Sequence, residues 1–316
     1  MKIVLVLGGL VLVAAFVVRI GAQLLRAGPR ALWLLVPYGV GTAIGAFPWA
    51  SLLPREMRPS PLAVLESRFA ASGANALLPF FGLAGEPSRL LWLPSTAQAR
   101  GVAAIVVDRV LYNAANGLLL LAGALAALGT PLARPLVSLA LVIAVLTLAV
   151  TAAGFWLVSR FGVGNRIQSL LRWLLGKSYG DADFGGQVDR ALLDIVGGPI
   201  STLLRGAGVH LLGKAAMGFE VYVGLWALGA SAGPVETLIL AVVPIALSFF
   251  FSSVPSQIGL QEGAQTLVAS SLGLDPAAVL SLVLLQRLRQ LAFASLLPLL
   301  LAAAPAPPSP PRQQEC

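Results

Sequence analysis

The chain is poor in charged residues, histidine and cysteine, and each shortage excludes a class of protein. Charged residues make up 11% of its 316 residues, whereas soluble domains carry about a quarter. One His and one Cys cannot build the ligand sets of zinc enzymes, and a single Cys forms no internal disulfide. The tripeptide GKS at 176–178 lacks the earlier glycine of a P-loop. We therefore expect no metal, no cofactor and no nucleotide.

Long apolar runs take the place of these residues. Hydrophobic residues make up 58% of the chain, and its mean hydropathy is +0.88. A helix of about 20 apolar residues crosses the core of a bilayer. Runs of this kind lie at 1–18, 31–53, 97–128, 136–158, 209–228, 235–254 and 277–301, and a weaker one lies at 62–78. The fold class that they predict is all-α, a polytopic membrane helix bundle of about eight spans.

The short basic loops predict the orientation of these spans. Loop 19–30 has three Arg and no acid, and loop 159–206 has six Arg or Lys against four Asp. The positive-inside rule places both loops in the cytoplasm. They share a side only if the weak run 62–78 also crosses, which keeps the count at eight and puts the C-terminus outside. The net charge of +8 forms no basic stripe with interleaved aromatics, so we expect contact with anionic lipid rather than with nucleic acid.

Two segments lie outside the predicted spans. The cytoplasmic loop contains apolar residues at helical spacing, separated by Asp and Arg, which predicts an amphipathic helix on the inner leaflet. These apolar residues are Val188, Leu192, Ile195 and Val196. Residues 305–316 form a Pro-rich tail without hydrophobic residues to bury, and we expect this tail to be disordered. Residues 1–304 are interpreted as a single integral membrane domain.

A short pattern occurs twice, as LPFFGLAGEP at 78–87 and as VPSQIGLQEG at 254–263. In each copy a Glu follows a Pro by seven residues. Two Gly lie between them in the first copy and one in the second. Each copy follows a hydrophobic run and precedes a long apolar helix that contains Arg. The residues expected to break the helices are Pro79, Gly82, Pro255 and Gly259. The pattern predicts a degenerate internal repeat, with halves at 31–128 and 209–302, and two broken or re-entrant segments.

The repeat also predicts a binding site. Broken helices expose backbone groups that only a cavity or a ligand satisfies, and an ionised group at mid-bilayer costs at least about 2.5 to 3.5 kcal/mol. The predicted substrate-binding residues are Asn75, Glu86, Arg109, Glu220, Gln257, Gln261, Glu262 and Arg287. We expect Glu86, Arg109, Glu262 and Arg287 to face one interior cavity. The alternative is that Pro and Gly only kink the helices and that each Glu pairs with an Arg to hold the bundle together.

The sequence SSVPSQIGLQEGAQTLVASSLGLDPAAVLSLVLLQRLRQL, at 252–291, resembles a known family. This is the flippase-like integral membrane family related to the transmembrane region of lysylphosphatidylglycerol synthases. HLLGKAAMGFEVYVGLWALG, at 210–229, is similar to the version in hopanoid-associated members. The resemblance implies about eight helices and the movement or handling of a lipid. It maps the family motif onto Pro255, Gly259, Glu262 and Arg287, with Asn75, Pro79, Glu86 and Arg109 as weaker matches.

Two departures from the family pattern matter. Ser256 and Gln257 stand where the family usually has two glycines after the proline, which leaves the tightness of that turn open. No aminoacyl-transferase domain follows the membrane region in this sequence, so the synthase activity is not implied.

Two functions remain open at this point. The first is a non-enzymatic lipid transporter or flippase of the bacterial inner membrane that moves a hopanoid or a phospholipid through an intramembrane polar cavity. The second is a scaffold or accessory subunit of a lipid-biosynthesis complex, whose partners include lipid-biosynthesis enzymes. Membrane lipids are the expected partners in both cases. The lone His210 is expected to have a partner in the bundle or to lie at the membrane interface.

Overall fold

The computed structural model describes residues 27–77, 85–175, 183–251 and 259–304, together with the single positions 18, 25 and 257. Within these residues the chain forms helices and no strand, which confirms the all-α prediction. The predicted span at 1–18, except for its last residue, and the tail 305–316 lie outside the described residues, as do the predicted breaks Pro79, Gly82 and Pro255.

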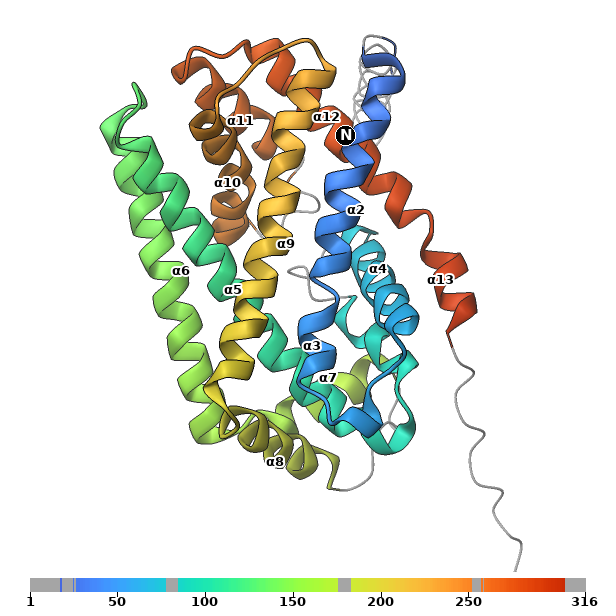
Figure 1. The fold of residues 1–316 in the computed structure, drawn as a ribbon. Coiled ribbons are helices and arrows are strands. Elements are labelled where there is room, and N and C mark those ends of the chain that lie inside the picture. Colours follow the sequence, from blue (N-terminus) through green and yellow to red (C-terminus); the bar gives the residue numbers. More distant parts are fainter. Residues whose placement is uncertain are drawn as a thin grey trace, which may run out of the picture.

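The described residues form the following helices in chain order. They are η1 (Gly28–Leu34), α2 (Leu35–Ile44), α3 (Phe47–Ser51), η2 (Arg55–Met57), α4 (Pro61–Leu77), η3 (Glu86–Trp92), η4 (Ser95–Ala97), α5 (Gln98–Ala127), α6 (Arg134–Phe161), α7 (Gly164–Leu175), α8 (Phe184–Val196), α9 (Ile200–Ala227), α10 (Pro234–Phe251), α11 (Leu260–Ser271), α12 (Pro276–Ala294) and α13 (Leu297–Ala303). The elements labelled η are 3₁₀ helices. Figure 1 shows α5, α6, α9 and α10 running side by side through one bundle.

Five helical segments among the described residues are long and apolar enough to cross a membrane. They are Gly28–Ser51, Ser95–Ala127, Arg134–Phe161, Pro234–Phe251 and Pro276–Ala303. A sixth is added if α8 and α9, which meet at a bend of 91°, count as one span. The short α4 does not qualify, because it has only 17 residues. The polytopic helix bundle is therefore confirmed, and the orientation inferred from the basic loops stays a prediction.

Helix α6 shows how the bundle meets the membrane. It is the least buried of the five segments and exposes a row of branched apolar side chains, including Leu139, Val142 and Val145. A water-soluble protein rarely exposes so large an apolar face, which here suits contact with lipid.

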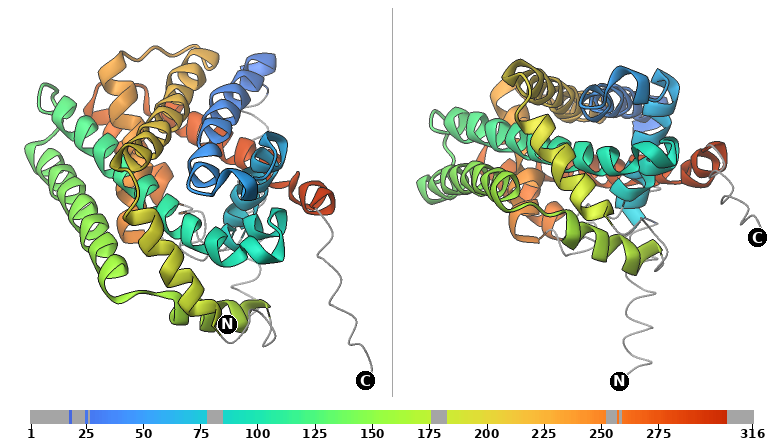
Figure 2. Two further views of the ribbon diagram at one scale, coloured as in Figure 1. Left: turned by 60° about the horizontal axis from the view of Figure 1, so that its bottom comes forward. Right: turned by 90° about the horizontal axis from the view of Figure 1, so that it is seen from below.

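The amphipathic helix predicted in loop 159–206 is present as α8, but its apolar face has a different partner. Val188, Leu192 and Ile195 are buried in one core cluster together with residues of α5 and α3. This face therefore packs on the protein and not on the inner leaflet, because the ends of α5 and α6 offer it an apolar surface. A second helix, α7, was not predicted. It packs against α8, and both lie across one end of the bundle (Figure 2).

The internal repeat stays a prediction, and the helix contacts can be laid against it. The order α4, η3, α5 in the first half corresponds to α10, α11, α12 in the second, and α2 corresponds to α9. Helix α2 packs on α9, α4 packs on α12, and α5 packs on α10. If the two halves are exchanged, α10 takes the place of α4 and α5 takes the place of α12. The contact of α4 with α12 then becomes the contact of α10 with α5, as expected for a pseudo-two-fold relation. The exact limits of the two halves remain a prediction.

The contact between α2 and α9 depends on glycine. A Cβ placed on Gly41 would lie 2.5 Å from the backbone oxygen of Gly213, and a Cβ on Gly213 would lie 2.8 Å from the oxygen of Gly41. Two glycines therefore let the backbones of these helices touch, as small residues do in membrane bundles.

The helix break predicted near Pro255 is confirmed on the residues at its two sides. Helix α10 ends at Phe251, and the separate helix α11 begins at Leu260. Gly259, which precedes α11, has a φ of 83°. Glycine adopts this left-handed conformation without the steric cost that a Cβ brings.

Candidate functional site

Glu262 and Arg287, two of the predicted site residues, meet in the second half. One carboxylate oxygen of Glu262 accepts a hydrogen bond from the Arg287 Nε at 3.2 Å, and the other accepts from the backbone N–H of Gly259 at 2.7 Å. The carboxylate thus satisfies an unpaired N–H at the start of α11 and neutralises the positive end of that helix. The bond to Arg287 also ties α11 to α12. This geometry agrees with the alternative in which the pair holds the bundle together.

The corresponding residues of the first half also meet. Glu86 Oε1 lies 3.4 Å from Arg109 Nη1, and Glu86 Oε2 lies 3.2 Å from Arg89 Nε. Asn75 accepts a hydrogen bond from the Gly85 N–H at 2.8 Å, and its amide nitrogen lies 3.5 Å from Glu86. The structure therefore brings together the three site residues predicted here, Asn75, Glu86 and Arg109, at the junction of α4, η3 and α5.

This cluster continues into the bundle through residues that were not predicted as site residues. Arg89 Nη1 donates to Asp108 at 2.9 Å, and the other oxygen of Asp108 lies 2.7 Å from His210 Nε2. All three side chains are buried, and they join η3, α5 and α9. The bundle partner expected for His210 is thus found. Buried charges persist only when they are paired and hydrogen-bonded, which is the arrangement here.

None of the cavities described below is lined by Glu86, Arg109, Glu262 and Arg287 together, so the shared cavity expected for them stays a prediction. Each acid pairs with an arginine of its own half. These pairs compensate the charge of each carboxylate within its half.

A polar cavity of about 190 Å³ lies elsewhere, between α2, α5, α9, α10, α11 and α12, and is named here the polar chamber. Its polar lining residues are Tyr38, Lys214, Glu220, Gln261, Gln265, Gln286 and Arg289. Glu220 and Gln261 were predicted, and the other five were not. Arg289 donates to Glu220, and its guanidinium lies 3.7 Å from the centroid of the Tyr38 ring. An ion pair and a cation–π contact therefore hold Arg289 in the wall of the chamber.

Gln265 stands out in this chamber. This residue is 1% exposed, and neither its amide nitrogen nor its amide oxygen has a hydrogen-bond partner among the described residues. One oxygen of Glu220 and the Nε of Arg289 are also without partners there. An unpaired buried polar group costs about 1 to 3 kcal/mol, so several in one cavity need an explanation. A polar ligand in the chamber would supply the partners.

A second, mostly apolar cavity of about 360 Å³ adjoins the polar chamber and is named here the apolar chamber. The two share the lining residues Leu119, Lys214, Gly218 and Ala241. The stacked rings of Phe219 and Tyr222 line the far part of the apolar chamber. The two chambers therefore lie side by side, one polar and the other mostly apolar.

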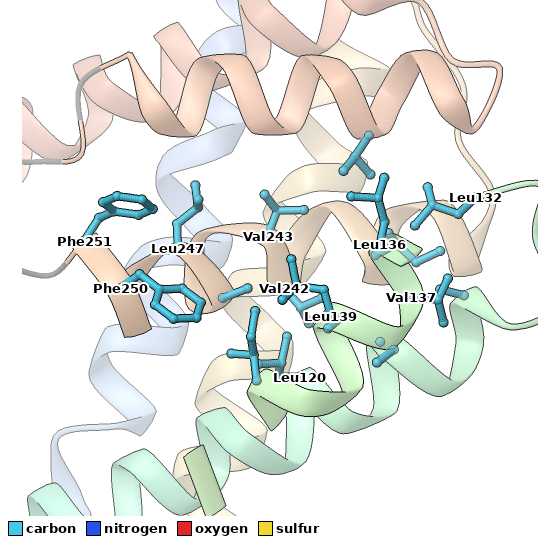
Figure 3. A pocket seen from close by; sticks show the side chains of 18 residues that line it. Leu120, Leu132, Leu136, Val137, Leu139, Val242, Val243, Leu247, Phe250 and Phe251 are labelled. Atoms are coloured by element: carbon cyan, nitrogen blue, oxygen red, sulfur yellow. The ribbon is translucent and has the colours of Figure 1, made fainter. Parts of the chain in front are cut away.

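A third cavity of about 250 Å³ lies on the other side of α10 and is lined by apolar residues throughout. Figure 3 shows Leu136 and Leu139 of α6 on one side and Val242, Phe250 and Phe251 of α10 on the other. This slot offers no hydrogen-bonding side chain, so it suits a hydrocarbon chain and not a headgroup.

The last predicted site residue, Gln257, lies outside the polar chamber. Its amide nitrogen donates to the Ser248 hydroxyl at 2.8 Å in an exposed position. No group of three or more His, Cys, Asp or Glu among the described residues could hold a metal ion.

Comparison with known proteins gives one match. The family model described as "Lysylphosphatidylglycerol synthase TM region" matches residues 2–297, which is nearly the whole chain. Neither the curated proteins nor the solved structures that were searched contain a match. The match confirms the family inferred from 252–291 and gives the chain a function related to membrane lipids. Membership of the hopanoid-associated subgroup stays a prediction.

Proposed function

Because the chain belongs to the family of the lysylphosphatidylglycerol synthase transmembrane region, we propose that it is a non-enzymatic lipid transporter of the bacterial inner membrane. The headgroup of an amphipathic lipid, a phospholipid or a hopanoid, occupies the polar chamber during transfer. The hydrocarbon tails stay in the apolar chamber and in the surrounding bilayer.

The observation that carries this proposal is the unpaired Gln265 in a chamber that shares lining residues with an apolar one. The amide can donate and accept, so it suits a headgroup with hydroxyl, amine or phosphate oxygen groups. The neighbouring Arg289 and Glu220 add a charged donor and a charged acceptor. A chamber that served only assembly would gain stability from apolar side chains at these positions.

The volume of the polar chamber limits what it can hold. At about 190 Å³ it is smaller than the pockets of roughly 300 to 1,000 Å³ that enclose whole small molecules. A headgroup fits this volume and a complete lipid does not. The tails must therefore remain in the apolar chamber or in the membrane.

Lipid movement in proteoliposomes tests the proposal. Purified protein is reconstituted with labelled phospholipids of several headgroup classes or with a labelled hopanoid, with and without an ion gradient. Gln265→Leu should keep the size of the side chain, remove its hydrogen bonds and abolish most of the movement. Gln257→Leu is the matched control, because Gln257 is exposed and bonds outside the chamber, and it should move lipid like the unaltered protein.

The scaffold function remains the second candidate. It is favoured by the ion pairs that join helices, such as Glu262 with Arg287 and Arg89 with Asp108. If the unaltered protein moves none of the lipids, or if Gln265→Leu moves them normally, the transporter proposal is wrong and the scaffold function gains.

A further inference from the structure

We infer that a phosphate group binds beside Tyr112, where Arg68, Arg109 and Lys214 converge. This site extends the proposed function, on which it rests, by naming the headgroup as one that carries phosphate. It lies next to the polar chamber and involves two residues, Arg68 and Tyr112, that neither line the chamber nor belong to the predicted site.

Three cationic groups from three helices surround one ring. Lys214 Nζ lies 4.1 Å from the centroid of Tyr112, the Arg109 guanidinium carbon lies 5.0 Å from it, and that of Arg68 lies 5.8 Å from it. Arg68 comes from α4, Arg109 from α5 and Lys214 from α9. One aromatic ring attracts a single cation by about 0.5 to 2 kcal/mol. It cannot offset the mutual repulsion of three cations in a poorly solvated site.

The acids nearby are already paired. Glu86 pairs with Arg89 and with Arg109 of the site, and Asp108 pairs with Arg89 and bonds to His210. Four arginine and lysine side chains, Arg68, Arg89, Arg109 and Lys214, therefore stand against two carboxylates. Counted without His210, two positive charges are in excess.

The excess belongs to Arg68 and Lys214. Neither forms a salt bridge with a carboxylate of the described residues, and the Nε of Arg68 is buried without a hydrogen-bond partner there. Glu220, the acid in the polar chamber, is bonded to Arg289. An anion from outside the chain is thus the partner that this geometry calls for.

Phosphate fits the donors better than a carboxylate does. The planar guanidinium of arginine presents paired N–H groups to two oxygens, and lysine adds a compact point charge. Three cations from three directions match the several oxygens of one phosphate group. A phosphomonoester carries about −1.5 to −2 charges at neutral pH, which matches the excess of two, whereas a phosphodiester carries one. We therefore expect a lipid that ends in a phosphomonoester to bind more tightly than a phosphodiester lipid or a zwitterionic one.

Lys214 connects this site to the transport path. Its Nζ donates to the Tyr112 hydroxyl, and the same side chain lines both the polar and the apolar chamber. A phosphate held beside Tyr112 therefore lies at the wall of the space through which the headgroup passes.

Calorimetric titration of the purified full chain in nanodiscs tests the site. The probes are short-chain phosphatidic acid, phosphatidylglycerol and phosphatidylcholine, and inorganic phosphate. Phosphatidic acid should bind about tenfold more tightly than phosphatidylglycerol, a difference of about 1.4 kcal/mol, and phosphatidylcholine should bind least. Arg68→Gln and Lys214→Gln should each weaken the binding of phosphatidic acid at least about tenfold.

Controls separate recognition from folding. Arg100→Gln removes a cation from the same helix as Arg109, but Arg100 pairs with the exposed Asp194, so phosphatidic acid should bind this variant normally. If Arg68→Gln fails to fold, Arg68→Lys takes its place, because it keeps the charge. Arg68→Lys should weaken the binding of phosphatidic acid less than Lys214→Gln does. Equal affinity for all three lipids, or affinity for phosphatidic acid unaffected by both Gln variants, would overturn the inference.

The remaining outcomes identify the source of the phosphate and separate the two proposals. If inorganic phosphate binds as tightly as phosphatidic acid and loses the same affinity in both variants, the site is supported. Its ligand is then free phosphate. Phosphate binding without any lipid movement leaves the site standing and refutes the transporter. Lipid movement that depends on Gln265, without a preference for phosphate, refutes the site and leaves the transporter standing.

Discussion

Glu86 and Glu262 stand at corresponding places in the two halves, and they differ in depth and in the number of their partners. Glu86 is 5% exposed and belongs to a buried network that continues through Arg89 into α5 and α9. The side chain of Glu262 is 13% exposed, and it bonds to the start of its own helix and to one arginine of α12. The same residue type at the same place in a repeat therefore lies in a dense network in one half and in a simple pair in the other.

This difference indicates that the two halves have taken different tasks. The first-half network uses its charges to join three elements, η3, α5 and α9. In the second half Arg289 pairs with Glu220, and Gln261, Gln265 and Gln286 line the polar chamber beside this pair. If the predicted repeat holds, the charges of one half join helices and the other half lines most of the polar chamber.

Breaking the first-half network should have the largest effect on stability. Asp108→Asn should lower the free energy of unfolding by about 3 kcal/mol, the low end for a broken buried ion pair, because Glu86 still pairs with Arg89. Denaturant titration in mixed micelles measures this loss. Asp194→Asn is the control, because its pair with Arg100 is exposed and exposed pairs contribute about 0 to 1 kcal/mol. Equal losses in both variants would contradict a special role for the network.

In the second half, Gln265→Leu should change stability in the opposite direction. Replacing a buried and unpaired amide by an apolar side chain should raise the free energy of unfolding by about 2 kcal/mol, within the penalty for such groups. The same titration shows the gain. A variant that is more stable and yet moves no lipid would mark Gln265 as functional. A clear loss of stability would mean that the amide has a structural partner instead.

Glu262→Gln should have a smaller effect than Asp108→Asn. The amide oxygen can still accept from the Gly259 N–H, but the buried Arg287 loses its charged acceptor, so we expect a loss of about 1.5 kcal/mol in unfolding free energy, the low end for a hydrogen bond to a charged group. Lipid movement should largely persist, because Glu262 does not line the polar chamber. Loss of movement in a stably folded variant would return Glu262 to the binding site.

The smallest of these effects should come from Gly259→Ala. Nothing lies within 4 Å of the added Cβ, so the only cost is the left-handed backbone at a φ of 83°, about 1 kcal/mol in unfolding free energy. Gly263→Ala is the control in the same helix, since its Cβ also enters open space and its φ is not positive. This control should be neutral or stabilising. A similar loss in both variants would show that the turn at Gly259 is not strained.

Features that depend on nearby residues could be predicted from the sequence. Pro255 and Gly259 act on the backbone beside them, so the end of α10 and the start of α11 were predicted to within a few residues. The cost of an unpaired charge in an apolar helix predicted that each Glu would pair with an Arg. It did not say that Glu86 would meet Arg109 and that Glu262 would meet Arg287.

The polar chamber could not be predicted in full, because its residues meet only through the packing of six helices. Gln261 and Gln265 are four residues apart and share one face of α11, but the sequence does not say which helices that face meets. The partner of α8 was missed for a related reason. Val188 and Leu192 give the same amphipathic pattern whether the helix lies on a leaflet or on protein.

The backbone contact between Gly41 and Gly213 has a mechanical consequence for the polar chamber. Helices that touch through their backbones leave no side chains between them to rearrange, so α2 and α9 form one stiff wall. The opposite wall includes α10, which carries Pro244 beside the chamber and ends at Phe251, and the separate α11. Any widening that admits a headgroup must then come from α10 and α11. A disulfide engineered across α2 and α9 should leave lipid movement intact, whereas one across α9 and α10 should stop it.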